Sequence, residues 1–322
     1  MPLAIQHDRA PLPAGTALAI GAFDGIHLGH RALIERAGRL APAVGVLTFA
    51  PHPARVLAPD RAPARLTTEG QRQRLLAHLG VSRLVLLPFT RALAETPAEV
   101  FARTTLVEGL RPSAVVVGAS FRFGRGRAGS PDDLARLCRP AGIEVSVLDE
   151  VPAPPACPAG PLSSTEIRRR LRAGDVAGAA CLLGRPHAVE GVVVRGAGRG
   201  RALGFPTANV ARVENALPAP GIYAGALRVR DRGADAPLWV AAISLGRNPT
   251  FEGPGAPLVL EVHALDADVD LYGAPVEVAF VQRLRDEQAF PSADALVRQI
   301  RDDVARTRAC VDVAALAEVW PP

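Results

Sequence analysis

The pattern of hydrophobic and polar positions changes character about halfway along the chain. In the first half, short apolar runs end at Ile20, Phe49, Leu87, Val117 and Leu148. Helical spacing separates these runs, near residues 30–40, 68–79, 97–107 and 131–138. Because strands that alternate with helices form parallel sheets with helices on both faces, this half predicts a doubly wound α/β domain.

The second half contains short β-like segments in place of helices. They cover residues 189–194, 222–229, 238–245, 258–264 and 276–281, with Gly, Pro and Asp turns between them. This pattern predicts an antiparallel β-barrel or sandwich. Helical spacing returns at 292–309, where Ser292 is a suitable N-cap residue. We therefore expect an antiparallel β-barrel followed by a terminal helix.

A proline-rich segment and a helix join the two halves. Residues 152–161 contain five prolines, a composition typical of a stiff, extended segment. Ser163 and Glu166 then have the spacing of a capping box, so a helix should begin there, and helical spacing runs on to Leu183. We place the boundary between the two predicted domains after this stretch, which gives residues 1–183 and 184–322.

Composition narrows the chemistry that the chain can perform. The chain has 322 residues, enough for two domains, of which 48% are hydrophobic and 21% charged. All 37 basic residues are arginine, which excludes Schiff-base lysine chemistry and a Walker A loop. The net charge of +5 suits anionic ligands, but aromatic residues make up only 4%, so we expect no nucleic-acid partner.

The sequence shows neither a signal peptide nor an apolar stretch long enough to span a bilayer. We therefore expect a cytoplasmic protein without a membrane partner, and leave self-association open. The four cysteines are Cys138, Cys157, Cys181 and Cys310, and none has a C-x-x-C spacing. We expect them to be reduced thiols, neither metal ligands nor a redox pair.

The first strong motif follows directly after the run that ends at Ile20. It reads Gly21-Ala-Phe23-Asp24-Gly25-Ile-His27-Leu-Gly29-His30. Its glycines allow the backbone to approach a phosphate, and His27 and His30 project from one face at the start of a helix. Two imidazoles at a helix N-terminus can stabilise charge on a transferred phosphate. A metal pair or two capping histidines are the alternatives, although a zincin would need a different spacing.

The second strong motif lies in the other half. It reads Gly196-x-Gly198-x-Gly200-Arg-x-Leu-Gly204-Phe205-Pro206-Thr207-Ala208-Asn209. Glycine amides can reach a phosphate chain, while Thr207 and Asn209 offer neutral oxygens for Mg²⁺. Further on, Glu261 lies between two apolar residues, where a lone carboxylate is unfavourable unless it is paired or functional. An ion pair with an arginine is the alternative role for Glu261.

One further glycine pattern is not expected to bind a dinucleotide. Gly124-Arg-Gly126-Arg-Ala-Gly129 fits G-x-G-x-x-G, but it does not lie in the first β–α turn, where a Rossmann fingerprint belongs. The arginines near 168–172 and 199–201 are typical of solvated faces.

Together these motifs resemble one family. H-x-G-H after a first strand resembles the nucleotidyltransferase superfamily. Three further segments narrow the resemblance to the prokaryotic bifunctional riboflavin kinase/FMN adenylyltransferase (FAD synthetase) family: Thr48-Phe49-Ala50-Pro51-His52-Pro53, Gly118-Ala-Ser-Phe-Arg-Phe-Gly124, and Ser163-Ser164-Thr165 with Arg168. The G-F-P-T-A-N stretch resembles the riboflavin kinase signature of the same family.

Shorter segments extend the resemblance over about residues 15–310. They are Gly221-Ile-Tyr223-Ala, Gly246-Arg-Asn-Pro249-Thr250-Phe251, Leu260-Glu261-Val-His263, Asp270-Leu-Tyr272-Gly273 and Leu284-Arg285-Asp-Glu287, continuing to Phe290. Two positions depart from the family's pattern. Ser120 stands where an acidic or amide residue is usual, and Asn248 stands where Arg is common.

The resemblance implies a nucleotidyltransferase-like α/β domain and a riboflavin kinase barrel. The barrel would phosphorylate riboflavin to FMN with MgATP, and the first domain would transfer AMP from a second ATP to FMN, giving FAD and pyrophosphate. Glu261 is implied as the general base, and His27 and His30 as the groups that stabilise the adenylyl transfer. The remaining implied contacts are Gly21, Phe23, Asp24, Gly29, Ser164, Thr165, Arg168, Gly196, Gly200, Gly204 and Pro206 for ATP, Pro51, His52, Phe121 and Arg122 for the flavin, and Thr207 and Asn209 for Mg²⁺.

Two other functions remain as alternatives. One is a different adenylyl- or cytidylyltransferase joined to an unrelated barrel. The other is an arginine-rich barrel that binds nucleic acid, which would show a steep salt dependence of binding.

Overall fold

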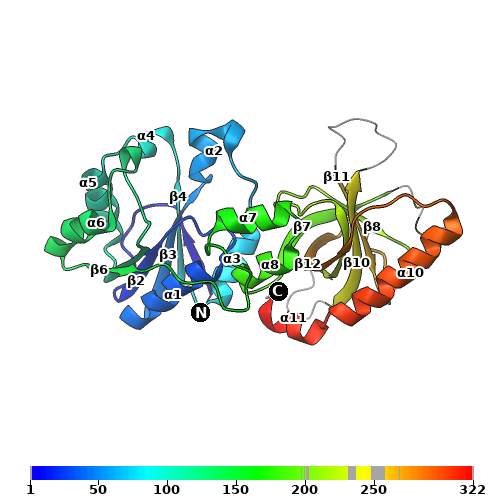
Figure 1. The fold of residues 1–322 in the computed structure, drawn as a ribbon. Helices are drawn as coiled ribbons and strands as arrows, with labels where there is room; N and C mark the ends of the chain where they lie inside the picture. The colour runs from blue at the N-terminus through cyan, green and yellow to red at the C-terminus, as the bar shows by residue number, and fades with distance from the viewer. Residues whose placement is uncertain are drawn as a thin grey trace. The chain divides into compact units, whose positions relative to one another are not determined.

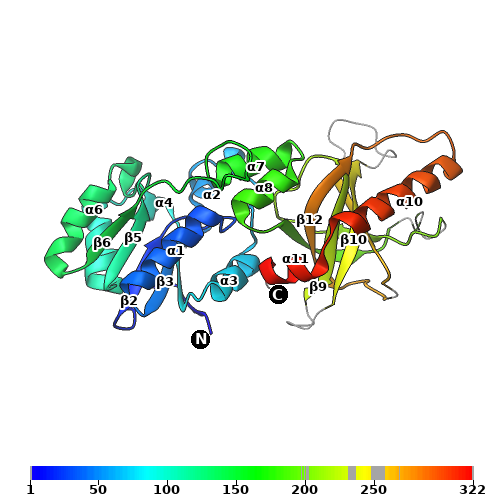
Figure 2. The ribbon, with the colours of Figure 1, turned by 60° about the horizontal axis from the view of Figure 1, so that its bottom comes forward.

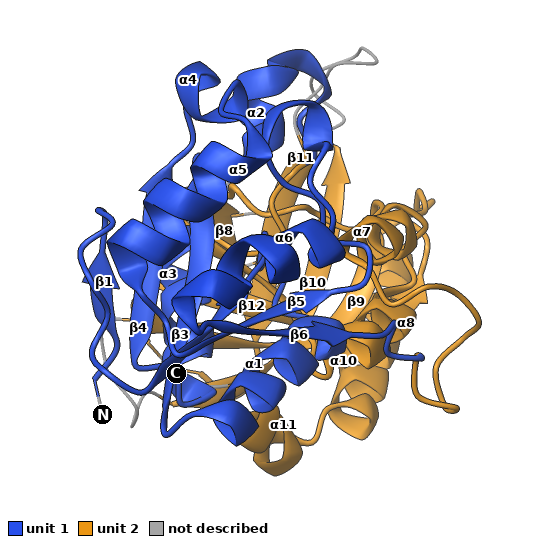
Figure 3. Ribbon diagram, turned by 90° about the vertical axis from the view of Figure 1, so that its left-hand side faces the viewer, with its two compact units in different colours: residues 1–63, 69–152 blue, residues 64–68, 153–322 orange. Residues whose placement is uncertain are grey.

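The structure is a computed structural model and describes residues 2–196, 198, 200, 203–230, 237–247, 258–267 and 269–320 (Figure 1). The chain divides into two compact units, shown in different colours in Figure 3. Unit 1 consists of residues 1–63 and 69–152, and unit 2 of residues 64–68 and 153–322. The residues between 153 and 183 thus belong to the same unit as the barrel. The boundary between the two activities after residue 183 stays a prediction.

Unit 1 is built on a parallel sheet of six strands in the order β1-β4-β3-β2-β5-β6. The strands are β1 (Ala4–Gln6), β2 (Thr16–Ile20), β3 (Ala43–Ala50), β4 (Arg83–Pro88), β5 (Ala114–Gly118) and β6 (Glu144–Leu148). In β2, Leu18 and Ile20 face one core and Ala17 and Ala19 face another, because successive side chains point to opposite faces. Both faces of the sheet are therefore apolar, as expected when helices cover each of them.

Helices cover both faces of this sheet (Figure 2). On one face α1 (Leu28–Leu40) and α3 (Glu69–His78) pack around Ala17 and Ala19. On the other face α5 (Ala98–Phe101), the π-helical η2 (Ala102–Leu110) and α6 (Pro131–Cys138) pack around Leu18 and Ile20. Shorter pieces are α2 (Pro53–Leu57), η1 (Pro59–Arg61), α4 (Arg91–Ala94), η3 (Arg125–Arg127) and η4 (Arg139–Ala141). The predicted doubly wound architecture is confirmed.

Unit 2 contains a closed antiparallel barrel in the order β10-β11-β8-β7-β12-β9. Its strands in the described part of the chain are β7 (His187–Val194), β8 (Ala208–Ala211), β9 (Gly221–Val229), β10 (Leu238–Arg247), β11 (Leu258–Ala264) and β12 (Pro275–Arg285). The predicted barrel is confirmed, and five of these strands lie where the alternating pattern placed them. The short strand β8 is not among the predicted segments.

Helices flank the barrel. α7 (Ser164–Arg172) and α8 (Val176–Leu183) contribute Ile167, Leu171 and Leu182 to the barrel core. α10 (Ala293–Cys310) begins after Ser292, whose hydroxyl accepts a hydrogen bond from the Ala295 amide at 3.2 Å. This confirms the predicted terminal helix, and a further helix, α11 (Val313–Val319), follows it. Among the described residues, no helix combines the length and the apolar character that crossing a membrane requires.

The prediction that all four cysteines are reduced is wrong. Cys157 and Cys181 form a disulfide, with Cα atoms 5.6 Å apart, while Cys138 and Cys310 are free. The C-x-x-C criterion detects only cysteines close in sequence, whereas these two are 24 residues apart and meet because the proline-rich segment folds back on α8. Burial raises the pKa of the Cys138 thiol to about 11, so this free cysteine is protonated at neutral pH.

Candidate active sites

Three segments predicted to bind substrate lie at one edge of the sheet of unit 1. β2 pairs with β3 on one side and with β5 on the other, and all three strands are parallel. Their carboxyl ends therefore lie at the same edge, where ligands bind in sheets of this class. The segment Gly21–His30 follows β2, Pro51 and His52 follow β3, and Phe121 and Arg122 follow β5.

The turn after β2, residues 21–27, is tied to the sheet at its start. The Gly21 amide donates to the Leu47 carbonyl at 3.2 Å, and the Thr48 hydroxyl donates to the Ala22 carbonyl at 3.0 Å. Phe23 and Ile26 adopt positive φ angles of 48° and 43°, and neither has exposed surface. Such conformations are strained for bulky residues, and strain of this kind concentrates at functional sites.

The two histidines lie against each other at the start of α1. His27 is the N-cap residue, and its Nδ1 accepts a hydrogen bond from the His30 amide at 3.4 Å. The two imidazole rings stack with centroids 3.7 Å apart, and each residue is less than a tenth exposed. The capping contact is made by Nδ1 of His27. The capping role of His27 is therefore observed, and its phosphate role stays a prediction.

The other predicted ATP contacts in this turn differ in accessibility. Asp24 is 8% exposed, and Gly29 is the second residue of α1. The Phe23 ring lies in the core and contacts the His30 ring at 4.9 Å between centroids. Packing accounts for the Phe23 side chain, and its assignment to ATP stays a prediction. Burial lowers the pKa of the adjacent Arg31 guanidinium, although an arginine remains charged at neutral pH.

The predicted flavin contacts of unit 1 have local partners. His52 caps α2 by accepting a hydrogen bond from the Ala54 amide at 3.2 Å. The Arg122 guanidinium donates to the carbonyls of Ala119 and Phe121 at 3.2 and 2.7 Å. Phe121 stacks on Phe123, a residue of the core. The flavin assignment of these residues stays a prediction.

Two of the three glycines in the G-x-G-x-x-G pattern have a packing explanation. A Cβ atom on Gly124 would lie 2.6 Å from the Ala98 backbone, and one on Gly129 would lie 2.7 Å from the Phe123 ring. α6 then begins after Ser130, which forms a capping box with Asp133. Close packing accounts for both glycines without a dinucleotide.

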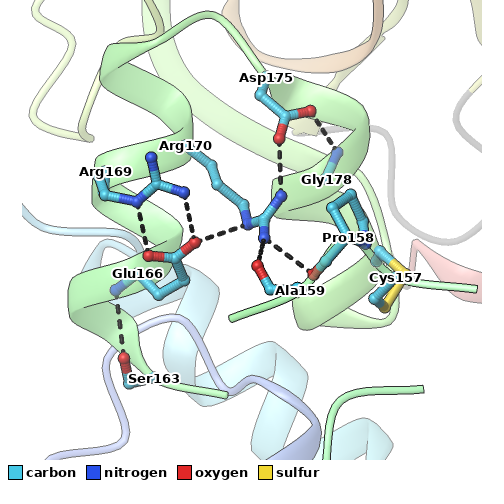
Figure 4. A network of polar contacts seen from close by, with 10 residues as sticks. Cys157, Pro158, Ala159, Ser163, Glu166, Arg169, Arg170, Asp175 and Gly178 are labelled. Atoms are coloured by element: carbon cyan, nitrogen blue, oxygen red, sulfur yellow. Dashed lines mark hydrogen bonds and ion pairs between the residues drawn. A yellow bond between two sulfur atoms is a disulfide. The ribbon is translucent and has the colours of Figure 1, made fainter. Parts of the chain in front are cut away.

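The helix that carries Ser164 and Thr165 begins in a tightly bonded corner of unit 2 (Figure 4). The Ser163 hydroxyl accepts from the Glu166 amide at 3.2 Å, which confirms the predicted helix start. Glu166 accepts two hydrogen bonds of 2.7 Å from Arg169, which hold the pKa of this carboxyl below its usual range. Buried Arg170 contacts Glu166 at 3.0 Å.

Arg170 and the disulfide fasten the proline-rich segment to the same corner (Figure 4). The Arg170 guanidinium donates to the carbonyls of Pro158 and Ala159, each at 2.9 Å, and to the Asp175 carboxylate at 2.8 Å. Pro158 adjoins Cys157, which is bonded to Cys181 of α8. The segment that leads into the helix is therefore held at two adjacent points.

Of the predicted phosphate contacts in this helix, Arg168 has an evident structural role. It is 8% exposed, and its guanidinium donates to the Ala64 carbonyl at 2.7 Å and to the Ser164 carbonyl at 3.3 Å. Thr165 is exposed, at the second position of the helix. These residues belong to unit 2 and the histidines to unit 1. That the two sets serve one reaction stays a prediction.

In the barrel, the strand that carries Glu261 has β8, with the predicted magnesium ligand Asn209, on one side and β10 on the other. On β11 its cross-strand partners are Asn209 of β8 and Ser244 of β10. Leu260 and Val262 point into the barrel core, so alternation places Glu261 on the outer face of the sheet. Among the described residues Glu261 forms no ion pair, so the arginine-pair alternative finds no support there.

The glycine-rich loop approaches the same residues closely. A Cβ atom on Gly196 would collide with the Asn209 side chain, and one on Gly200 with the Phe205 carbonyl. The Phe205 amide donates to the Gly200 carbonyl at 2.8 Å, which closes the turn. Gly204 has a φ angle of +86°, which favours glycine. Arg199 and Arg201 lie outside the described residues, as do Asn248, Pro249, Thr250 and Phe251.

Two pockets meet at Thr207. The first, called the Glu261 pocket, has a volume of about 330 Å³, and the second, called the Tyr272 pocket, about 590 Å³. The Glu261 pocket is lined by Gly200, Leu203, Phe205, Thr207, Ile222, Ala242, Ile243, Ser244, Glu261, His263, Arg285, Glu287, Gln288, Phe290, Leu296, Ile300 and Asp303. The Tyr272 pocket is lined by Val193, Arg195, Pro206, Thr207, Ala208, Val262, Ala264, Ala267, Val269, Asp270, Leu271 and Tyr272.

The walls of the two pockets have different chemistry. In the Glu261 pocket, Ile222, Phe290, Leu296 and Ile300 form an apolar surface between the barrel and α10, which suits a flat, largely apolar ligand. Desolvation raises the pKa of Glu287, which also lines this pocket. In the Tyr272 pocket, an exposed tyrosine lies 5.7 Å from the Arg195 guanidinium, so an aromatic ring and a cation are presented together.

Sequence reasoning missed the apolar half of the Glu261 pocket. Ile243, Leu296 and Ile300 belong to no motif, and Ile222 had no role assigned within the Gly221–Ala224 segment. All four follow ordinary strand or helix periodicity. Their only signal is the i, i+4 spacing of Leu296 and Ile300 on α10, and that spacing is equally typical of core contacts.

The oxygen atoms at the start of β8 fit a magnesium ion. Thr207 directly precedes β8 and Asn209 lies within it, so residues two apart present a hydroxyl and an amide oxygen on one face. Mg²⁺ is commonly held by one or two protein groups together with phosphates and waters. The close approach of Gly196 to Asn209 brings the glycine-rich loop to the same point.

Comparisons with known proteins assign the two halves of the chain to two different enzyme families. The family model for FAD synthetase matches residues 10–156, and the model for riboflavin kinase matches residues 183–311. The alternative of a nucleotidyltransferase joined to an unrelated barrel is therefore wrong.

Two relatives illustrate the similarity. The bifunctional riboflavin kinase/FMN adenylyltransferase of Escherichia coli K12 is 40% identical over 94% of this chain and 95% of its own. That of Listeria monocytogenes is 36% identical over 91% of each chain.

A solved structure shares both parts of the fold. It is a Streptococcus pneumoniae chain described as a macrolide-efflux protein, with 30% identity, a TM-score of 0.82, and coverage of 96% of this chain and 99% of that one. The full-length similarity to the E. coli and Listeria proteins, and the two family models in order, show that this chain belongs to the bifunctional riboflavin kinase/FMN adenylyltransferase family.

Proposed function

We propose that this chain makes FMN from riboflavin and ATP in the barrel, and FAD from FMN and a second ATP in unit 1. One observation supports the kinase assignment above the others. Thr207 lines both the apolar Glu261 pocket and the Tyr272 pocket, so an acceptor in the first would meet a nucleotide phosphate in the second at one hydroxyl. Riboflavin suits the Glu261 pocket, and ATP suits the Tyr272 pocket.

In the kinase reaction, Glu261 acts as the general base. The acceptor is the 5′-hydroxyl of the ribityl chain, an alcohol that must lose its proton as it attacks the γ-phosphorus of ATP. The Glu261 carboxylate takes that proton, the γ-phosphoryl group moves to the ribityl oxygen, and ADP leaves. Positioning and neutralisation of phosphate charge supply the rest of the catalysis, as in other phosphoryl transfers.

Thr207 and Asn209 hold Mg²⁺ in this proposal. The ion, when bound, neutralises negative charge on the phosphates during transfer. The glycine-rich loop with Gly196, Gly200 and Gly204 brings backbone amides to the phosphates, and the Pro206 backbone borders the Tyr272 pocket.

In the adenylyl transfer, an FMN phosphate oxygen attacks the α-phosphorus of ATP and pyrophosphate leaves. The attacking phosphate is already an anion, so this step needs stabilisation of charge rather than a base. His27 and His30 donate hydrogen bonds to the reacting phosphate, next to the amides at the N-terminus of α1. Gly21, Asp24 and Gly29 shape the turn, and Ser164, Thr165 and Arg168 are proposed to contact the phosphates.

Product analysis tests the proposal. The purified chain is incubated with MgATP and riboflavin, and separately with MgATP and FMN, and the flavins are separated by chromatography. We expect FMN and FAD from riboflavin, and FAD from FMN. Absence of both products would refute the proposal, and FMN without FAD would restrict it to the barrel. Titration of Mg²⁺ in the same assay tests the metal assignment.

A further inference from the structure

We propose that His263 is a positioning residue of the kinase site, which holds the Phe205–Thr207 corner in place through a hydrogen bond to the Pro206 carbonyl. The inference rests on the proposed kinase function of the barrel. It assigns a role to a residue of the Leu260–His263 segment beyond the base, Glu261.

The first observation is where the pairing of two strands stops. β8 and β11 pair at Val210 with Leu260, at Asn209 with Glu261, and at Ala208 with Val262. The next pair in this register would bring Thr207 opposite His263, but the ladder ends before it. Pro206 has no N–H group and cannot donate to a neighbouring strand. The β8–β11 ladder thus gives no further hydrogen bond where residues 205–207 turn away from the sheet.

A side chain supplies the missing contact. Nδ1 of His263 lies 2.7 Å from the Pro206 carbonyl oxygen. Because a carbonyl oxygen only accepts, Nδ1 must carry the proton and donate. The imidazole also meets the Phe205 ring edge to face, with centroids 5.7 Å apart. His263 therefore contacts the two residues that precede Thr207.

The corner has a second tie on its other side. The Phe205 amide donates to the Gly200 carbonyl, and a Cβ atom on Gly200 would lie 3.3 Å from the Thr207 hydroxyl oxygen. Gly200 and His263 thus bracket the Phe205–Thr207 corner from the loop and from β11. Together, the His263–Pro206 and Phe205–Gly200 hydrogen bonds fix the Thr207 hydroxyl between the two pockets.

Strand geometry links this contact to the base. Glu261 and His263 are two residues apart on β11, so their side chains lie on the same outer face of the barrel. Both line the Glu261 pocket. One strand therefore fixes the carboxylate that takes the proton and also the hydroxyl proposed to hold the metal. An error in the Thr207 position would weaken phosphoryl transfer more than riboflavin binding.

Two substitutions separate the hydrogen bond from the ring. His263→Phe keeps an aromatic ring against Phe205 but cannot donate to Pro206. His263→Asn loses the ring but places an amide N–H near the position of Nδ1. We expect His263→Phe to lower kcat for riboflavin phosphorylation roughly tenfold, which is the scale of one lost hydrogen bond. The KM for riboflavin should change less than about twofold, and His263→Asn should recover most of the rate.

A binding measurement without turnover accompanies the kinetics. Calorimetric titration of each variant with ADP, at several Mg²⁺ concentrations, reports the metal-dependent part of nucleotide affinity. His263→Phe should weaken that part several-fold and leave ADP binding without Mg²⁺ unchanged. FAD formation from supplied FMN should match the wild type in every sample, because that reaction is assigned to unit 1 and His263 lies in unit 2.

Several outcomes would overturn the inference. Wild-type kinetics and MgADP affinity in His263→Phe would show that the hydrogen bond has no positioning role. A rise in the riboflavin KM with unchanged kcat would make His263 a flavin contact. Loss of rate in His263→Asn but not in His263→Phe would assign the effect to the ring, and His263→Asn decides the matter if His263→Phe does not fold. If the wild type makes no FMN yet its MgADP affinity depends on His263, the kinase proposal fails and the positioning role stands.

Discussion

The two phosphate-handling regions of this chain are constructed in opposite ways. The turn after β2 in unit 1 draws its residues from one continuous stretch, with stacked, buried imidazoles and two bulky residues at positive φ. The Glu261 pocket in unit 2 draws its residues from the glycine-rich loop, from β9, β10 and β11, and from α10. A single local motif is sufficient for the first region, whereas the second exists only once the barrel has closed.

The chemistry of the two acceptors explains part of this difference. FMN presents a phosphate that is already a nucleophilic anion, so hydrogen-bond donors at a helix N-terminus are the main requirement. Riboflavin presents an alcohol, so a base must lie beside the acceptor, and an apolar wall must hold the ring. A barrel with Glu261 on one strand and isoleucines on others can provide both at once.

The largest expected effect comes from removing the base. Glu261→Gln keeps the size of the side chain but cannot take the proton, so FMN formation should fall about 100- to 10,000-fold. FAD formation from supplied FMN should remain at the wild-type rate, because that reaction is assigned to unit 1. Chromatographic product analysis measures both rates, and Glu261→Ala should give the same division. Glu318→Gln, an exposed carboxylate of α11, is the matched control.

Comparable loss of both activities in Glu261→Gln would contradict the separation of the two sites. Loss of FAD formation alone would reverse the assignment of the base.

Substitutions of His27 and His30 should have the opposite result, with FAD formation lost and FMN formation kept. His27→Asn retains a side chain that can cap α1 but removes the imidazole, and His30→Asn removes the stacked partner. Each should reduce FAD formation from FMN roughly 100- to 1,000-fold, the scale seen when one donor to a transition state is lost. FMN formation from riboflavin should be unchanged. His78→Asn, an exposed histidine of α3, is the control.

The double variant of His27 and His30 sharpens this test. Because the two rings are in contact, the free-energy effects of the two substitutions should not add. The double variant should form FAD at nearly the rate of the less active single variant. Full additivity would indicate that the histidines act on separate groups.

The contrast between the regions also sets how much the sequence can reveal. The β2–turn–α1 unit is predictable because the strand pattern, the glycines and the histidines are adjacent in the chain. In the barrel, Glu261 and Thr207 stand out as polar residues among apolar ones. Ile222, Ile243 and Ile300 do not, because an apolar residue that lines a pocket has the same periodicity as one in the core.

Strand β8 and the disulfide were not predicted from the sequence, for a different physical reason. β8 has only four residues and begins just beyond Pro206 and Thr207, so local propensity favours a turn there. Pairing with β7 and β11 makes it a strand. The Cys157–Cys181 bond depends on how residues 152–161 fold against α8, a tertiary contact that spacing alone does not encode.

This disulfide offers a way to alter unit 2 without touching either pocket. It closes a loop of 24 residues, so its removal should lower the stability of unit 2 by about 3 kcal/mol. The unfolding midpoint of that unit should fall roughly 6–12 °C in scanning calorimetry, on adding a reducing agent or in Cys157→Ser with Cys181→Ser. Cys310→Ser, a free cysteine of α10 in the same unit, should leave the midpoint unchanged.

Equal midpoints for the oxidised and reduced protein would show that hydrogen bonds from Arg170 hold this segment without the disulfide. A shift confined to unit 1 would contradict the division of the chain into these two units.

The smallest expected effect concerns Glu287, another carboxylate that lines the Glu261 pocket. Desolvation raises the pKa of Glu287 in the folded protein, so the folded state favours the protonated form. The stabilising contribution of this carboxyl is fully present below the unfolded pKa and is lost as the pH rises through the folded pKa. Glu287→Gln should therefore raise the midpoint of unit 2 at pH 7, and the difference from wild type should vanish as the pH falls toward about 4. Because the side chain is partly exposed and screened, we expect a gain of about 0.5 kcal/mol or less, or roughly 1–2 °C in calorimetry. A lower midpoint at pH 7 would show that the ionised carboxylate stabilises the barrel, and the Glu318→Gln control excludes a general effect of charge.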